Sequence, residues 1–77
     1  MYSLYFSTWF FPEDGSCYEV VDHSEDYDNI EDALVALIYW IKLHPGAYPD
    51  PCPNGIIEIV TPIENGRQPC VCIMEDE

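Results

Sequence analysis

The sequence predicts an α+β domain of the order ββαββ, in which one helix packs on one face of a four-stranded, mostly antiparallel sheet. Three observations lead to this prediction. Only residues 28–44 are long enough, and free enough of Gly and Pro, to form a helix. Two segments before the helix and two after it are rich in apolar residues, and turn residues separate the members of each pair. The 77 residues make one compact domain, 1–77.

The N-terminal strands are expected at residues 2–11 and from Ser16 to about His23. The first of these segments is dense in aromatic and hydroxyl residues, which favour β-structure. Residues 12–15, Pro-Glu-Asp-Gly, supply the turn between the two strands. Residues 24–29 are acidic and polar, so they predict a connection that leads to the start of the helix.

The helix is expected to begin at Asp28, because Asp28 and Glu31 have the spacing of a capping box. His44-Pro45-Gly46 ends it, since Pro45 disfavours helical geometry at the residue before it. The helical period predicts a core stripe of Ile30, Ala33, Leu34, Leu37, Ile38 and Ile41. It predicts a solvated face of Glu31, Asp32, Val35, Tyr39 and Lys42, with Trp40 near the border.

The C-terminal half is expected to hold an irregular loop and a second hairpin. Residues 45–55 contain Pro45, Pro49, Pro51 and Pro53, which predict the loop. Strands are expected at 55–61 and 69–74, and Asn65-Gly66 between them predicts a type I′ turn. An acidic tail, 75–77, follows.

The alternation of the strand residues predicts two faces for the sheet. The helix side is expected to carry Leu4, Phe6, Tyr18, Val20, Ile57, Ile59, Val71 and Ile73. The far face is expected to carry Tyr5, Ser7, Trp9, Glu19, Val21, Glu58, Val60, Cys70 and Cys72. This far face is less polar than an ordinary solvated sheet face, so it is a candidate surface for a homodimer or for a partner.

Charge is the most unusual property of the composition. Asp and Glu number 15 against 2 Lys and Arg, a formal net charge of −13. A small domain needs a net charge of only about 2–8 in magnitude to be soluble. Negative charge beyond that range destabilises the folded state through self-repulsion. The chain is therefore not expected to bind nucleic acid or anionic membranes directly, but it is suited to bind proteins that do.

The lack of a recognisable targeting signal and the four cysteines bear on the cellular compartment. No basic stretch precedes an apolar run at the N-terminus, and no apolar run approaches the length of about 20 residues that a membrane span needs. We therefore expect a cytoplasmic protein whose four cysteines, Cys17, Cys52, Cys70 and Cys72, are mostly reduced.

Residues 19–32 concentrate acids and contain no Lys or Arg. The acids are Glu19, Asp22, Glu25, Asp26, Asp28, Glu31 and Asp32. Alternate strand positions lie about 6.6 Å apart and helix neighbours at i,i+3 lie about 5–6 Å apart, so a folded surface can present these carboxylates to Lys and Arg side chains that normally contact phosphates. Helix capping is the competing explanation for Asp28, Glu31 and Asp32. It does not explain Asp22, Glu25 or Asp26.

Metal and enzyme sites are less well supported by the sequence. The acidic segment 22–28 contains no Gly, so it does not match a calcium-binding EF-hand loop. Cys70 and Cys72 are the only closely spaced cysteines, and they lack the usual spacing of a zinc knuckle. A zinc site formed by the cysteines with His23 and His44 stays an alternative. We expect no cofactor and no enzymatic activity, because no nucleophile motif, Gly-rich phosphate loop or His-x-x-x-His pair is present.

The segment 19–32, the helix after it and the two-base composition resemble the small acidic inhibitors that phages encode against host nucleic-acid machinery, namely anti-CRISPR and DNA-mimic anti-restriction proteins. The resemblance rests on size and charge and includes no specific motif. It implies a non-enzymatic inhibitor, in the cytoplasm of a host bacterial cell, that blocks target DNA binding by occupying the basic nucleic-acid-binding site of a CRISPR surveillance complex. The acids of segment 19–32 would meet Lys and Arg of the target, and Tyr39, Trp9 or Tyr5 would add an aromatic anchor.

Two further functions stay open as alternatives. One is an immunity or antitoxin protein that neutralises a basic nuclease, which would use the same kind of surface. The other is a homodimeric accessory module that uses the far face of the sheet.

Overall fold

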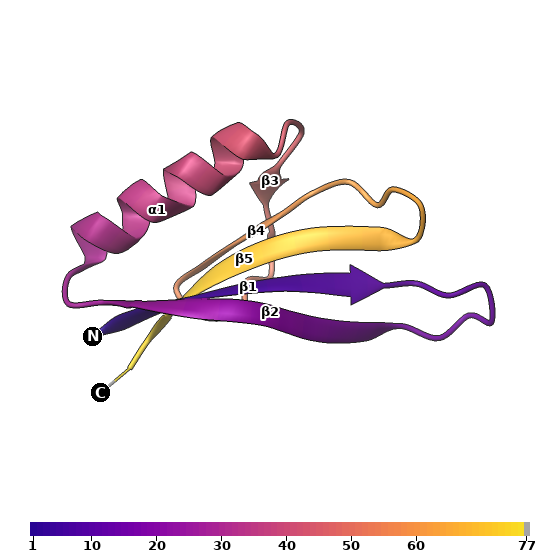
Figure 1. Cartoon of the computed structure of the whole chain (residues 1–77), viewed down its shortest axis with the longest axis horizontal. Coiled ribbons are helices and arrows are strands. Elements are labelled where there is room, and N and C mark those ends of the chain that lie inside the picture. The colour runs from indigo at the N-terminus through magenta and orange to yellow at the C-terminus, as the bar shows by residue number, and fades with distance from the viewer. Residues whose placement is uncertain (77) are drawn as a thin grey trace.

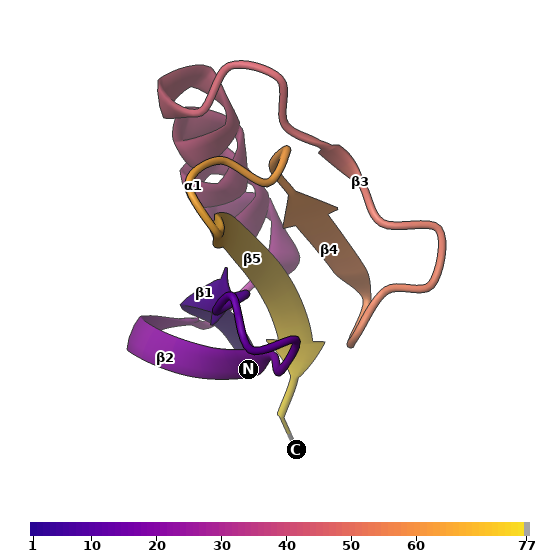
Figure 2. The same ribbon diagram turned by 90° about the vertical axis from the view of Figure 1, so that its right-hand side faces the viewer.

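A computed structural model describes residues 1–76 and has an α+β fold, with one helix on a five-stranded antiparallel sheet (Figure 1). The strand order is β2-β1-β5-β4-β3. The sheet is strongly twisted, so that β2 and β4 run in very different directions (Figure 2). The elements are β1 (Tyr2–Phe10), β2 (Tyr18–Tyr27), α1 (Ile30–Leu43), β3 (Tyr48–Pro49), β4 (Ile57–Val60) and β5 (Arg67–Glu75).

The prediction of four strands was wrong by one short strand. β3 lies inside the proline-rich segment that was expected to be an irregular loop, and it pairs Tyr48 with Val60 and Pro49 with Ile59. The backbone N–H of Asp50 donates to the carbonyl of Glu58 at 2.9 Å and extends this contact. Pro49 is tolerated because β3 is an edge strand, where a missing N–H costs least.

β2 is longer than the sequence predicted. Ser24, Glu25 and Asp26 were expected in a connection, but they continue the strand to Tyr27. Pairing with β1 along its whole length outweighs the low β propensity of Asp and Glu. The register shifts once, because Phe6 faces His23 and Ser7 faces Val21, so Asp22 is the extra residue of a β-bulge.

The N-cap of α1 is Asn29, one residue later than the Asp28 that the sequence predicted. The side-chain oxygen of Asn29 accepts from the backbone N–H of Asp32 at 2.9 Å, and its amide donates to the Asp32 carboxylate at 3.2 Å. The Asx pairing of Asn29 with Asp32 therefore replaces the pairing of Asp28 with Glu31. The helix ends at Leu43, before Pro45, as expected.

The core lies between α1 and the centre of the sheet, and it consists of Leu4, Ala33, Leu37, Trp40, Ile59, Val71 and Ile73. The helix is rotated from its predicted orientation. Leu34 and Ile38 were expected in the core but are 38% and 51% exposed, whereas Trp40 is only 9% exposed. The indole of Trp40 offers more apolar area than either aliphatic side chain, and it stacks on the ring of His44 with centroids 4.0 Å apart.

The two faces of the sheet follow the predicted alternation in its centre. Leu4, Ile59, Val71 and Ile73 lie in the core, and Phe6 and Ile57 pack against it. Tyr18 and Val20 were expected there too but are 51% and 43% exposed, because the hairpin extends beyond the end of the helix (Figure 1). There Tyr18 stacks on Phe10 instead.

The far face of the sheet is more closed than the alternation suggested. Glu58, Val60, Cys70 and Ser7 are buried on this face. The loop after β3 folds against it, since the backbone N–H of Asn54 donates to the carboxylate of Glu58 at 3.2 Å. These contacts close part of the far face to solvent.

The second hairpin turns as predicted. Asn65 and Gly66 both have positive φ, at 53° and 72°. Glu64 and Arg67 exchange both backbone hydrogen bonds at 2.9 Å. These features confirm the type I′ turn.

The two ends of the described chain meet at the same place. The N-terminal amine of Met1 donates to the carbonyl of Asp76 at 3.3 Å, and the backbone N–H of Asp76 donates to the carbonyl of Met1 at 2.9 Å. The ends therefore lie at the opposite end of the molecule from the turn between β1 and β2 (Figure 1).

Candidate functional site

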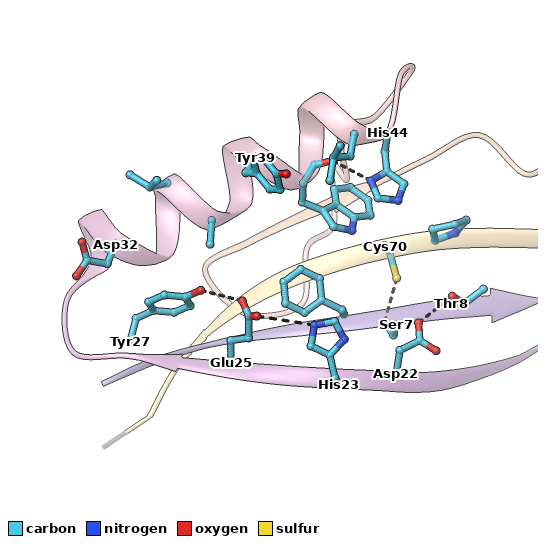
Figure 3. A pocket seen from close by; sticks show the side chains of 16 residues that line it. Ser7, Thr8, Asp22, His23, Glu25, Tyr27, Asp32, Tyr39, His44 and Cys70 are labelled. Atoms are coloured by element: carbon cyan, nitrogen blue, oxygen red, sulfur yellow. Dashed lines mark hydrogen bonds and ion pairs between the residues drawn. The ribbon is translucent and has the colours of Figure 1, made fainter.

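An open groove of about 970 Å³ runs between β2 and α1 (Figure 3). The chain reverses direction at residues 28–29, so the helix returns along the strand that precedes it. One wall of the groove is formed by β2 and the other by α1, and β1 supplies part of the floor. The main lining residues are Phe6, Thr8, Asp22, His23, Glu25, Tyr27, Asp32, Val35, Ala36, Tyr39, Trp40, Leu43 and His44.

The bulge in β2 explains why two consecutive residues line the groove. Neighbouring strand residues normally point to opposite faces of a sheet. Because Asp22 is the extra residue of the bulge, both Asp22 and His23 face α1. The hydroxyl of Thr8 donates to the Asp22 carboxylate at 3.1 Å and holds it in place. His23 stacks on Phe6, with ring centroids 4.4 Å apart.

The helix contributes a large apolar surface to the groove. Val35, Tyr39 and Leu43 are 67%, 66% and 58% exposed. Single exposed apolar residues are common on protein surfaces, but here they border one groove and lie beside the half-buried Phe6 and Tyr27. Such a surface is suited to contact an apolar part of a ligand.

The groove also carries negative charge, from Asp22, Glu25 and Asp32. Glu25 accepts a hydrogen bond from the hydroxyl of Tyr27 at 2.8 Å, and this bond raises the pKa of Tyr27 because the donor must keep its proton. His23 lies 3.9 Å from Glu25. No Lys or Arg lines the groove.

The two basic residues leave the acids uncompensated. Among residues 1–76, neither Lys42 nor Arg67 forms an ion pair with a carboxylate. Arg67 instead lies over the ring of Phe10, with its guanidinium carbon 5.7 Å from the ring centroid. Within residues 1–76, the acids of β2 and of the start of α1 therefore form no ion pair with Lys or Arg.

The groove borders an open strand edge. β2 is the outermost strand of the sheet and pairs only with β1. All of its residues except Tyr27 are exposed. About half of its backbone N–H and C=O groups point away from β1, and no strand within residues 1–76 pairs with them.

The structure divides the predicted site residues between two faces. Asp22, Glu25, Asp32 and Tyr39 come together in the groove. The other acids of β2 project to the far face: the hydroxyl of Ser7 donates to Glu19 at 2.9 Å, and that of Ser3 donates to Asp26 at 2.7 Å. Ser3 also hydrogen-bonds Asp76.

The remaining predicted residues lie outside the groove. Tyr5 and Trp9 alternate with Leu4 and therefore face the far side, where both are partly buried. Asp28 and Glu31 are exposed at the turn into α1 and in its first helical turn. The seven acids thus form a band around the β2 edge and the start of α1, Tyr39 lies in the groove further along the helix, and Tyr5 and Trp9 lie on the far face.

Sequence reasoning missed several groove residues. Leu43 was not singled out as a contact, and neither were Phe6, His23 or Tyr27, whereas Val35 and Tyr39 were noted as apolar residues on the solvated face of the helix. The signal in the sequence was that apolar residues occupy nearly every side of residues 30–43, which is more than one core-facing stripe requires.

Cys70 and Cys72 are poorly suited to act as nucleophiles. All four are free, and Cys70 and Cys72 lie on the far face. Burial raises the pKa of both thiols, that of Cys72 to about 11, and the nearby Glu58 adds to the effect. Cys70 lies 3.1 Å from the hydroxyl of Ser7. In residues 1–76 there is no group of three or more His, Cys, Asp or Glu placed to hold a metal ion.

No protein-family model, curated protein or solved structure matches this chain. Within residues 1–76 the helix is not long and apolar enough to cross a membrane.

Proposed function

We propose that the protein is a non-enzymatic, anti-CRISPR-like inhibitor whose acidic surface occupies the basic nucleic-acid-binding site of a CRISPR surveillance complex and blocks binding of target DNA. The observation that carries the proposal is the acidic edge strand: β2 is exposed along its length, and its acids continue around the turn into α1 without an ion pair to Lys or Arg among residues 1–76. These acids are Glu19, Asp22, Glu25, Asp26, Asp28, Glu31 and Asp32.

The placement of the carboxylates suits a cationic channel. Asp22 and Glu25 lie on the groove side of β2, and Glu19 and Asp26 lie on the far side. The edge of β2 is therefore a narrow ridge with negative charge on both flanks. A channel that normally encloses a phosphate backbone would meet carboxylates from both directions, and Arg and Lys bind carboxylates with the same donors that they use for phosphate.

The excess charge also fits competition with a polynucleotide. Long-range attraction between an acidic protein and a basic channel raises the association rate, and salt screens it. This benefit offsets the self-repulsion that a net charge of −13 imposes on the folded chain. Catalysis is not needed for such an inhibitor.

The proposal is tested in bacterial strains that each carry one defined CRISPR type and are challenged with a phage that the system targets. Expression of the protein is expected to restore plaque formation in at least one strain. The purified complex from that strain should then lose target-DNA binding when the protein is added, and the affinity of the protein for the complex should fall as salt is raised. Full phage restriction in every strain would refute the proposal.

Matched charge reversals locate the surface. The double variant Glu25→Lys/Asp26→Lys is expected to lose inhibition, because it reverses two charges on the ridge. The control Glu13→Lys/Glu64→Lys makes the same change in net charge at exposed sites outside the band and is expected to inhibit normally. Circular dichroism checks that both variants fold. If the ridge variant inhibits as well as the wild type, the ridge is not the interface.

A further inference from the structure

We infer that the groove and the open edge of β2 form one docking site for an extended, cationic and amphipathic segment of a partner protein, which joins the sheet as a further strand beside β2. This inference rests on the proposed function and specifies which kind of element in the basic partner is recognised. The site combines backbone pairing along β2 with side-chain contacts in the groove.

Backbone pairing is available along the groove. The groove runs along β2 from Asp22 to Tyr27. This stretch of strand spans about 20 Å at the usual rise of about 3.3 Å per residue. A strand laid along it would direct every second side chain toward α1, about 6.6 Å apart. Main-chain hydrogen bonds would supply affinity, and the alternating pockets would supply specificity, as in other cases of strand addition.

The lining of the groove selects the chemistry of those side chains. Asp22, Glu25 and Asp32 favour Arg or Lys, and within residues 1–76 neither Lys42 nor Arg67 forms an ion pair with them. Between the acids, Val35, Tyr39 and Leu43 offer exposed apolar surface. An Arg guanidinium group can also lie over the face of the Tyr39 ring in a cation–π contact. The complementary segment therefore alternates outward polar residues with inward Arg, Lys and aliphatic residues.

A second copy of this chain fits the edge poorly. Antiparallel pairing of β2 with β2 over its whole length would place Glu19 of each copy opposite Asp26 of the other. Like charges directly opposite one another destabilise a strand pair. Each copy also carries a net charge of −13. Charge thus directs the edge away from self-association and toward a cationic segment.

The test uses the whole protein and a labelled peptide of ten residues, the length of β2, with the sequence Thr-Arg-Thr-Leu-Thr-Arg-Thr-Leu-Thr-Arg. Fluorescence anisotropy measures its affinity at moderate ionic strength. Two further peptides carry N-methyl groups, one on every Thr and the other on every Arg and Leu. Successive residues of a strand direct their N–H groups to opposite edges, so strand addition predicts that only one of the two methylated peptides loses binding.

Matched variants test the groove. Tyr39→Ala is expected to weaken binding of the unmethylated peptide about tenfold or more, as loss of an aromatic anchor does. Ile38→Ala is the control, because Ile38 is also more than half exposed but does not line the groove. Its affinity should stay within about twofold of the wild type. Equal binding by both methylated peptides, or equal effects of the two substitutions, would overturn the inference.

The two proposals fail in different ways. If the peptide docks as described but phage restriction is never relieved, the docking site stands and the inhibitor function is wrong. If phage restriction is relieved while the peptide does not bind and Tyr39→Ala inhibits fully, the inhibitor function stands and the docking site is wrong. A concentration-dependent dimer in sedimentation experiments that Glu19→Lys strengthens would assign the β2 edge to a second copy and would also overturn the inference.

Discussion

Substitution of Gly55 by Ala tests how the proline-rich loop is attached to the sheet. Gly55 has φ of +74°, and a Cβ there would overlap the carbonyl oxygen of Ile73 and lie 2.5 Å from the sulfur of Met74. The same carbonyl accepts the backbone N–H of Ile56 at 2.8 Å, so it cannot move away without losing that bond. Gly15 is the matched control, because its φ is +87° and a Cβ there meets nothing within 4 Å.

The expected magnitudes follow from this geometry. In both variants the Ala side chain lowers the free energy of unfolding by about 1–2 kcal/mol, because the residue has a left-handed backbone conformation. Gly55→Ala also strains or breaks the hydrogen bond between Ile56 and Ile73, at about 1 kcal/mol, and adds about 1–3 kcal/mol of overpacking. We therefore expect losses of about 1–2 kcal/mol for Gly15→Ala and about 3–6 kcal/mol for Gly55→Ala.

Urea unfolding monitored by tryptophan fluorescence measures both losses, since Trp40 is in the core and reports on its exposure. At about 4–8 °C per kcal/mol, thermal midpoints should also separate the two variants clearly. Equal loss of stability in the two variants would refute the close approach of the loop to β5.

Two other predictions concern the helix cap and a buried thiol. Asn29→Ala should lower the free energy of unfolding by about 1 kcal/mol, and Asp28→Ala by less than half of that, because Asn29 caps the helix. Thermal denaturation of both variants measures the two losses. A larger loss for Asp28→Ala than for Asn29→Ala would identify Asp28 as the cap. Burial raises the pKa of Cys72 from 9.0 to about 11, so the folded state keeps this proton longer than the unfolded state. Stability should therefore be intact below pH 9.0 and fall as pH rises toward about 11. Urea titrations across this window should show a smaller fall for Cys72→Ala, whereas an equal fall would assign the effect to other groups.

The fold class could be predicted because its main signals are local. Asn65-Gly66 sets the second hairpin through positive φ at both residues, and Pro45 ends the helix. The alternation of β4 and β5 also placed Ile59 and Val71 on the helix side. These features depend on neighbours in the sequence, so the sequence alone is sufficient.

The errors arose where tertiary contacts decide between local alternatives. Residues 30–43 are apolar on nearly every side, so periodicity could not choose between Ile38 and Trp40 for the core. Ser24 to Asp26 resemble a polar loop, but pairing with β1 makes them part of a strand. The two-residue strand β3 has no signal of its own, since only the position of β4 creates it.

The candidate site was predictable in charge but not in shape. The acids of residues 19–32 were evident from composition, and Tyr39 was named as an aromatic anchor because aromatic residues often carry much of the binding energy of an interface. The division of the acids between the two flanks of β2 depends on the bulge at Asp22. No local sequence pattern predicts this bulge. The groove itself depends on how the helix lies across the sheet (Figure 3).

The meeting of Met1 with Asp76 has a practical consequence for any fusion or affinity handle. The Ser3 hydroxyl joins Asp76 to Asp26, so a handle attached at either end would emerge beside the acidic ridge and could shield it from a partner. A handle inserted in the solvent-exposed turn at residues 12–15 would project from the opposite end of the molecule (Figure 1). Because Met1 and Asp76 are adjacent, a short linker could join the two ends in a circular permutant whose new ends lie at residues 12–15. Such a permutant would suit display or capture experiments, because its ends lie away from the acidic ridge.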